Sequence, residues 1–402
     1  MTVVRNFILI ILGITALYKP SFGQITPGQL SGKEINTVTT AVPFLTISPD
    51  SRSGGMGEVG AALSADANSM HWNPAKYAFA PNDMGLSISY TPWLRKLIPD
   101  INLAYLSGYK RIDKQQVIAI SLLYFSLGNI TFTDNVGNTT NTFNPNEFSI
   151  DAAYARSFTN KFSGSLAFRF IYSNLTGGAY VGGLESHPGM AFASDVSLFY
   201  RNNELRLRDY DATFAFGMNI SNIGSKMSYT ENSDKDFIPI NLRLGAAYTI
   251  DFDDYNSLTA ALDVNKLLVP SPPLYYPTAD SVDERGDPVI KSGYDPNVSV
   301  AVGMFHSFYD APSGVSEELR EITYAFGLEY WYAKQFAIRS GLFYEDGTKG
   351  NRKFFTVGIG LRLNVFGLDF SYLVPINNQN SPLANTLRFS LLFDFAGLNG
   401  KK

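Results

Sequence analysis

The sequence predicts a transmembrane β-barrel, and three observations lead to that fold class. Aromatic residues make up 14% of the chain and charged residues only 17%, whereas about 25% charged residues is usual for a soluble surface. After the N-terminal segment there is no run of 18 apolar residues, which disfavours a helical membrane protein. Segments of about ten residues alternate between apolar and polar or small side chains, as strands between lipid and a lumen do.

The N-terminal segment predicts export. Arg5 precedes a twelve-residue apolar run that is too short to cross a bilayer as a helix, and a short polar stretch that ends Ser21-Phe22-Gly23 follows it. We expect residues 1–23 to be a cleaved signal peptide. The alternative, a retained amphipathic anchor, is disfavoured because the run is apolar on all sides. Removing Arg5 and Lys19 changes the net charge from −4 to −6, which gives no basic surface for nucleic acid.

The alternation also predicts which way the strands face. In the segment 240–250 the even positions are apolar and the odd positions are polar or small, whereas in the segments 355–363 and 387–395 the odd positions are apolar and the even positions are mostly polar or small. Arg243, Arg362 and Arg388 lie on the polar sides. An arginine facing lipid near the bilayer midplane costs roughly 2–4 kcal/mol, so these three side chains are predicted to point into the lumen.

Fifteen segments satisfy the strand pattern, whereas bacterial single-chain barrels have an even number of strands. They are 84–92, 100–111, 115–127, 147–158, 162–173, 190–201, 211–222, 240–250, 256–268, 295–308, 321–333, 336–345, 355–363, 366–375 and 387–395. We therefore predict fourteen antiparallel strands, with the error after residue 309, where the alternation of loop lengths falters. A soluble β-sandwich is the alternative, but strands of ten to twelve residues with aromatic ends favour the barrel.

The connections predict the orientation. Short turns such as 111–114 and 157–161 alternate with long loops near 128–146, 174–189, 223–238 and 269–294, and barrels place the long loops outside the cell. In the last of these loops, prolines hold the chain extended and display apolar and aromatic side chains. The candidate partner-binding residues there are Pro272, Leu274, Tyr275 and Tyr276.

Residues 24–83 have no strand alternation and are predicted to be an N-terminal extension and hatch, before a barrel of residues 84–402. Glycine and alanine at this density allow backbone to pack closely on backbone, and the proline marks the start of a short helix. The residues that define this hatch motif are Gly54, Gly55, Gly57, Asp66, Asn73 and Pro74.

At these residues the sequence resembles a known family. The stretch GMGEVGAALSADANSMHWNPAKYAF, 55–79, ahead of a many-stranded barrel is similar to the hatch of FadL-like outer-membrane transporters. The residues 40–79 together with 85–110 more closely resemble the PorV (LptO) family of the Bacteroidetes type IX secretion system. The resemblance implies a fourteen-stranded barrel in the cell outer membrane that takes part in protein export.

The resemblance also implies a function. Members of the family bind the folded C-terminal signal domains of cargo at the SprA-type translocon and deliver them to a PorU-type sortase for release or attachment to surface lipopolysaccharide. Such a chain is a shuttle and adaptor. Two other functions stay open, namely FadL-like uptake of hydrophobic small molecules and lipid A deacylation. The polar side chains expected in the lumen, which include Asp195 and Asp394, favour the adaptor over a path for fatty substrates.

Catalytic, metal-binding and cofactor-binding residues are not predicted. The chain has no cysteine, and its three histidines, His71, His187 and His306, lie in no nucleophile or metalloprotease motif. His71 is predicted to be a hydrogen-bonded hatch residue and His306 a strand residue. The acidic loop between Asp280 and Asp287 lacks the order of a calcium-binding loop and is interpreted as solvated.

Overall fold

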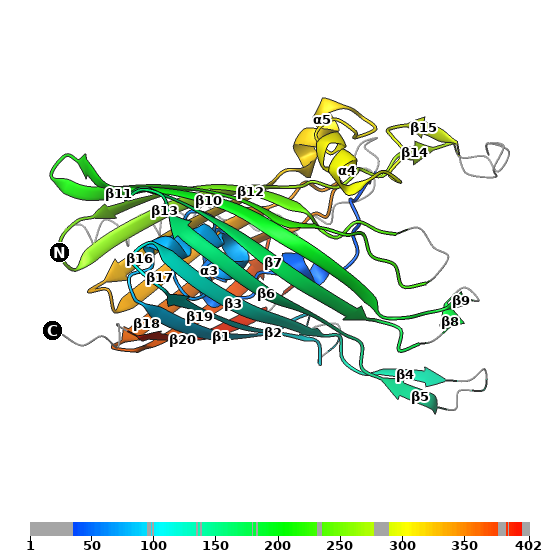
Figure 1. The fold of residues 1–402 in the computed structure, drawn as a ribbon, viewed down its shortest axis with the longest axis horizontal. Coiled ribbons are helices and arrows are strands. Elements are labelled where there is room, and N and C mark those ends of the chain that lie inside the picture. The colour runs from blue at the N-terminus through cyan, green and yellow to red at the C-terminus, as the bar shows by residue number, and fades with distance from the viewer. Residues whose placement is uncertain are drawn as a thin grey trace.

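A computed structural model of the chain is shown in Figure 1. It describes residues 35–94, 98, 100–133, 136, 139–178, 180–181, 184–230, 235–276, 289–376, 383–384 and 386–395. The predicted signal peptide, the first part of the N-terminal extension and the acidic loop at 280–287 lie outside the described residues. Among the described helices, none has the length and apolar character needed to cross a membrane.

Fourteen antiparallel strands form a closed barrel, which confirms the predicted fold class. Each strand pairs with its neighbour in the barrel, and β1 closes the ring against β20, with Leu86 opposite Phe393. The strands are β1 (Met84–Pro92), β2 (Asn102–Arg111), β3 (Gln116–Ser126), β6 (Asn146–Ser157), β7 (Phe162–Asn174), β10 (Gly189–Leu207), β11 (Tyr210–Gly224), β12 (Asn241–Asp251), β13 (Asn256–Leu267), β16 (Thr323–Tyr332), β17 (Phe336–Tyr344), β18 (Lys353–Leu363), β19 (Phe366–Pro375) and β20 (Leu387–Phe395).

The prediction of a strand at 295–308 is wrong, and so is the strand assigned to His306. The helix α4 (Val300–His306) occupies this segment, and the Ser299 side chain caps it by accepting a hydrogen bond from the backbone N–H of Val302. Apolar residues at alternate positions led to the strand prediction here. The residues between them are mostly apolar as well, so the segment lacks true alternation. Without this segment fourteen predicted strands remain, and the error lies before residue 309 rather than after it.

The burial pattern confirms the predicted facing of the strands. Arg243 and Arg388 are buried toward the lumen, whereas outward-facing apolar residues such as Phe168 and Phe192 are each 69% exposed on the wall. Arg362 is half-buried and pairs with Asp369 of β19. The outer wall is therefore the lipid-facing surface, and the lumen is polar.

The two ends of the barrel differ. Turns of two to four residues join the strands at one end, which we call the short-turn end. At the other, the long-loop end, the connections carry extra elements. These are the hairpins β4 (Ile130–Thr133) with β5 (Thr139–Phe143), β8 (Tyr180–Val181) with β9 (Leu184–Glu185) and β14 (Leu274–Tyr275) with β15 (Ile290–Ser292), and the helices α4, α5 (Val315–Glu318) and η4 (Leu319–Glu321).

The segment before β1 runs through the lumen from the long-loop end to the short-turn end. It begins beside the loop after β17, where the backbone N–H of Asn36 donates to the Thr348 carbonyl at 3.1 Å. It contains η2 (Pro43–Thr46), α2 (Ser51–Gly54), α3 (Ser69–Trp72) and η3 (Pro74–Phe79), and α3 is seen between the strands in Figure 1. Most of residues 41–80 are buried, so this hatch fills the barrel.

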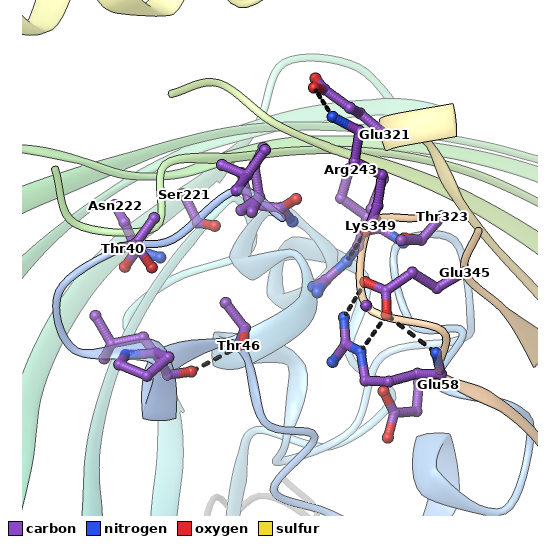
Figure 2. Close-up of a pocket in the computed structure, with 18 of the residues that line it drawn as sticks. Thr40, Thr46, Glu58, Ser221, Asn222, Arg243, Glu321, Thr323, Glu345 and Lys349 are labelled. Atoms are coloured by element: carbon purple, nitrogen blue, oxygen red, sulfur yellow. Dashed lines mark hydrogen bonds and ion pairs between the residues drawn. The ribbon is translucent and has the colours of Figure 1, made fainter. Parts of the chain in front are cut away.

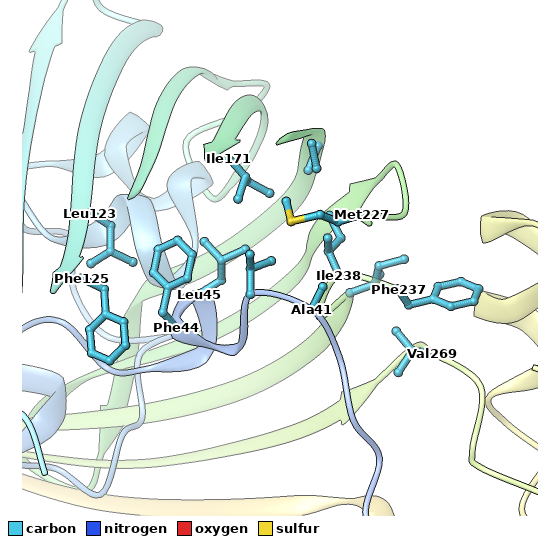
Figure 3. Packing of buried hydrophobic residues seen from close by; sticks show 14 of the residues in the cluster. Ala41, Phe44, Leu45, Leu123, Phe125, Ile171, Met227, Phe237, Ile238 and Val269 are labelled. Carbon is cyan, nitrogen blue, oxygen red and sulfur yellow. The ribbon is translucent and has the colours of Figure 1, made fainter. Parts of the chain in front are cut away.

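An apolar cluster holds the first part of the hatch at the long-loop end (Figure 3). Phe44 stacks on Phe125 of β3, with ring centroids 6.3 Å apart, and Leu45 is also buried. The backbone N–H of Ala41 donates to the Phe237 carbonyl at 2.9 Å. Burial of two large apolar side chains from this segment contributes about 1.5–3 kcal/mol each, which fixes it against the wall.

Candidate functional site

The hatch meets the wall backbone to backbone. Gly57 has φ of +70°, which is unfavourable for residues with a side chain, and a Cβ there would lie 2.6 Å from the Leu342 backbone nitrogen. On the wall, a Cβ added to Gly341 would lie 2.1 Å from the backbone nitrogen of Gly57. Real Cβ atoms do not approach this closely, so glycine is required on both sides of this contact.

Polar wall side chains satisfy the backbone N–H groups of the hatch. The Asp263 carboxylate on β13 accepts from the N–H groups of Gly60 and Ala61 at 2.7 and 2.9 Å. The Thr356 hydroxyl on β18 accepts from the Gly57 N–H at 2.8 Å. Since a buried amide without a partner costs roughly 1–3 kcal/mol, these wall residues determine how the irregular hatch backbone sits in the lumen.

A chain of alternating charges joins the hatch to four strands. Arg52 of the hatch donates two hydrogen bonds to Glu329 of β16, at 2.7 and 3.0 Å. Arg339 of β17 donates to the same carboxylate at 2.7 Å and to Asp369 of β19 at 2.8 Å. Asp369 also pairs with Arg362 of β18 at 2.7 Å. Every charge along this chain has an opposite partner, which is what stabilises ions out of water.

The residues of the predicted hatch motif have structural contacts. Asp66 pairs with Arg52 at 2.9 Å. The Asn73 side-chain nitrogen donates to the carbonyls of Ala61 and Leu198, and its oxygen accepts from the Ala75 N–H and so caps η3. Pro74 is the first residue of η3.

The other two motif glycines also lie against the wall. A Cβ on Gly54 would lie 2.7 Å from the Arg388 side chain, and a Cβ on Gly55 would lie 3.1 Å from the Cα of Gly358. Neither position has room for an ordinary side chain without a shift of its neighbours, so both glycines belong to the same close contact as Gly57.

A cavity of about 450 Å³ lies in the lumen between the hatch and the start of the N-terminal segment. In Figure 2, Thr40, Ser221 and Asn222 lie on one side of it, and Arg243, Thr323 and Glu345 lie on the other. Its lining is mostly hydroxyl, amide and charged side chains, and His71 and Trp72 also line it. This is the polar lumen that the sequence predicted.

The insertion between β13 and β16, of which residues 268–276 and 289–322 are described, forms what we call the outer module. Two lysines fix it to the barrel: Lys266 of β13 pairs with Glu318 and Glu321, and Lys349 pairs with Glu317 and Glu321, all at 2.7–2.9 Å. Figure 1 shows α4 and α5 beyond the outline of the barrel wall at the long-loop end.

The carboxylate of Glu317 is tightly held in this module. Burial opposes its ionisation, but hydrogen bonds from Lys349 Nζ, the Ser313 N–H and the Asn36 side chain outweigh that effect and lower the pKa of Glu317 to about 2. The module is therefore held by a carboxylate that stays ionised at neutral pH, and Asn36 connects it to the N-terminal segment.

The outer module exposes large apolar side chains. One side of α4 packs on the barrel, where a Cβ on Gly303 would touch the Phe237 ring, while Phe305 is 71% exposed. Five of the exposed side chains lie on α4 or near it in the sequence, and we call them the aromatic face: Tyr294, Val302, Phe305, Phe308 and Tyr309. A helix that is apolar all round is normally covered on all sides, so one side of α4 lacks its cover in this chain.

The candidate partner-binding residues lie at the start of the same module, and the structure divides them. Tyr275 and Tyr276 are exposed at the hairpin formed by β14 and β15. Pro272 and Leu274 are half-buried, and the Pro272 carbonyl accepts a hydrogen bond from Asn36 at 2.9 Å. Of the four residues, the two tyrosines are therefore the most exposed.

The three histidines lie in separate places. The His71 ring packs edge-on against Trp72 and Tyr105, and among the described residues its Nε2 has no hydrogen-bond partner, contrary to the prediction of a hydrogen-bonded hatch residue. His187 is exposed in the loop after β9. His306 on α4 contacts Tyr294 and Tyr309 of the outer module.

The fold and the filled lumen define an outer-membrane β-barrel protein with an internal hatch. A family model described as "Type IX secretion system protein PorV" matches residues 30–274, more than half of the 402-residue chain. The chain therefore belongs to the PorV family and is an outer-membrane component of the type IX secretion system. Most of the outer module lies beyond the matched residues. No curated protein matches the chain.

Several solved outer-membrane structures are similar to the chain. The toluene transporter TbuX of Ralstonia pickettii is 11% identical with a TM-score of 0.44, covering 86% of this chain and 98% of its own. The monoaromatic hydrocarbon channel CymD is 14% identical with a TM-score of 0.45, over 87% and 98%. A FadL homologue of Pseudomonas aeruginosa is 11% identical with a TM-score of 0.42, over 90% and 99%.

Proposed function

We propose that this PorV-family barrel is a shuttle and adaptor without catalysis of its own. It binds the folded C-terminal signal domain of a secreted protein at the SprA-type translocon and passes it to a PorU-type sortase, which releases it or attaches it to lipopolysaccharide. The proposal includes cleavage of residues 1–23 as a signal peptide, with residues 24–83 as the extension and hatch and 84–402 as the barrel.

The observation that carries the proposal is the aromatic face on a fixed support. The five side chains of the aromatic face are exposed on the outer module, and the module is held to the barrel by buried lysine–glutamate pairs. Rigid, exposed aromatic residues favour protein binding, because they bury large areas while losing little conformational freedom. Tyr275 and Tyr276 extend the available surface, as expected of the candidate partner-binding loop.

The firm attachment of the hatch also supports the adaptor function. Its glycines touch the wall, its amides are bonded to wall side chains, and Arg52 shares Glu329 with Arg339. Moving the hatch aside would break these contacts together. An adaptor needs a stable barrel, whereas a path along the barrel axis needs the hatch to open.

The transporter alternative has less support. A groove of about 500 Å³ lies on the outer wall beside Phe168 and Phe192, but Arg169, paired with Asp151 and Asp195 at 2.5 and 3.2 Å, lies behind it. A hydrophobic solute that passed from this groove to the lumen would have to separate buried ion pairs, which is costly.

The experiment is affinity purification of the tagged, full-length protein from outer membranes in mild detergent. The Phe305→Ser, Phe308→Ser double variant is expected to recover at least tenfold less translocon, sortase and cargo than the wild type. Phe158→Ser is the matched control, because this phenylalanine is 56% exposed but lies in a turn at the short-turn end. Equal recovery with the double variant, at equal amounts of folded barrel, would contradict the proposal.

A further inference from the structure

Arg243 is a buried cation without a carboxylate partner within the described part of the chain. It is 9% exposed, and its Nε donates to the Asn265 side chain at 2.8 Å. Its Nη1 makes long contacts to the carbonyls of His71 and Trp72, at 3.3 and 3.5 Å, and its guanidinium lies 4.5 Å from the centre of the Trp72 ring. Its Nη2 has no hydrogen-bond partner among the described residues, although the side chain lines the 450 Å³ cavity.

The other charges around the cavity are already matched. Arg169 pairs with Asp151 and Asp195, and Arg352 pairs with Glu345. Lys349 pairs with Glu317 and Glu321, and Glu58 pairs with Arg388. Among the described lining residues, Arg243 is therefore the cation without a direct ion pair, although the carboxylates of Asp263, Glu58 and Asp195 act on it at longer range. A buried, unpaired cation is unfavourable unless an anion joins it, which indicates an anionic ligand.

The charge balance selects a monoanion. One arginine without a direct ion pair has room for one carboxylate, and the carboxylates of Glu58, Glu321 and Glu345 also line the cavity. A phosphate monoester carries close to two negative charges at neutral pH, since its second pKa is about 6. It would face these carboxylates with only one free cation, whereas a carboxylate accepts both donors of an arginine fork and adds a single charge.

The rest of the lining selects a hydroxylated ligand. Hydroxyl and amide side chains surround the guanidinium, and those of Ser221, Asn241 and Thr323 have no hydrogen-bond partner among the described residues. An acyl chain would leave these groups unsatisfied, whereas sugar hydroxyls can both donate to and accept from them.

We propose that this cavity is a binding site for a hydroxylated monocarboxylate of the sugar-acid class, whose carboxylate lies against Arg243 and whose hydroxyls meet the surrounding amides and hydroxyls. The site is separate from the aromatic face, and the proposal does not depend on the adaptor function. A free sugar acid and a sugar acid within a surface polysaccharide share this chemistry.

The test is calorimetric titration of the purified, full-length barrel in detergent with D-glucuronate. Glucuronate is expected to bind at least tenfold more tightly than glucose, inorganic phosphate or laurate. Equal or tighter binding of any of these three probes, or no binding of glucuronate, would overturn the proposal. A glucuronate-terminated oligosaccharide distinguishes the sources: comparable binding indicates a polysaccharide ligand, and binding of the monosaccharide alone indicates a free acid.

Substitutions test whether glucuronate binds in the cavity beside Arg243. Arg243→Gln is expected to weaken glucuronate binding at least tenfold, and Arg243→Lys less, because the charge is kept. Arg206→Gln is the charge-matched control, since this arginine is 72% exposed at its side chain and lies beside the turn that follows β10. If Arg243→Gln does not fold, Thr323→Val tests the same cavity through a lost hydroxyl. Unchanged affinity in the folded variant would show that the ligand lies elsewhere.

Discussion

Arg52 of the hatch and Glu329 of β16 form a buried, two-pronged ion pair, with nitrogen–oxygen distances of 2.7 and 3.0 Å. The two residues are 277 positions apart in the sequence. Since Glu329 also accepts from Arg339 at 2.7 Å, one carboxylate holds a hatch cation and a wall cation together. The hatch is thus part of the electrostatic structure of the barrel.

Replacing Glu329 by alanine is expected to destabilise the folded barrel by about 3–5 kcal/mol, because two buried arginines lose their shared partner. The measurement is urea unfolding of the barrel in detergent, followed by its heat-modifiable gel mobility. Glu204→Ala is the control: its pair with Lys161 is exposed and is worth at most about 1 kcal/mol. Similar losses for the two variants would contradict the buried network.

Adding a methyl group to the wall tests whether the close contact between hatch and wall keeps the barrel closed. Gly341→Ala places a Cβ 2.1 Å from the Gly57 nitrogen and is expected to displace the hatch, whereas Gly358→Ala, whose Cβ would lie 3.2 Å from the Cα of Gly55, should have a smaller effect. The measurement is uptake of a large antibiotic by cells and ion conductance in planar bilayers. A tight barrel with Gly341→Ala would mean that the wall can move to admit the methyl.

Asn73→Asp separates the two roles of the Asn73 side chain, which caps η3 with its oxygen and donates hydrogen bonds with its nitrogen. The aspartate keeps an oxygen for the Ala75 N–H but loses the donors to the Ala61 and Leu198 carbonyls. The expected loss is about 1–3 kcal/mol, because the buried Ala61 carbonyl loses this donor, and thermal unfolding measures it. A variant as stable as the wild type would show that the cap alone explains why asparagine stands at this position.

The outer module is expected to loosen in acid. The pKa of Glu317 is about 2 in the folded protein and is lowered from an ordinary 4.5, so the group stabilises the module above pH 4.5, and this contribution is lost as the pH falls from about 4.5 to about 2. Limited acid proteolysis or hydrogen exchange of residues 289–322 measures it. With Glu317→Gln the transition in this pH range should disappear, and its persistence would point to another group.

The barrel could be predicted from the sequence because strands between lipid and lumen alternate with a period of two. The same rule failed at 295–308. This segment contains the helix α4, which has apolar residues both on the side that packs on the barrel and on the exposed side. Alternation placed Arg243 and Arg388 in the lumen, but it could not give their partners. The contacts of Glu329 and Asp263 with the hatch are not predicted, because their partners are 277 and 203 positions away in the sequence. Asp369 is not predicted either, because the pattern does not show which arginine it meets.

The candidate partner-binding loop was also predicted only in part. Proline and tyrosine content indicated an exposed recognition segment, and Tyr275 and Tyr276 are exposed. The sequence does not predict the larger aromatic face on and beside α4, because its alternation indicates a strand there. A capping serine before a run that is apolar at every position was the available sign of a helix.

The central claim is that the barrel works in secretion with its hatch closed, and an engineered disulfide tests it most directly. Ser51→Cys with Ser390→Cys introduces two thiols where a hatch N–H and a wall hydroxyl lie 2.9 Å apart, in a chain that has no other cysteine. Cells carrying the oxidised double variant are expected to secrete cargo at the rate of the two single-cysteine variants. Secretion that stops when the hatch is locked, and returns on reduction, would contradict the claim.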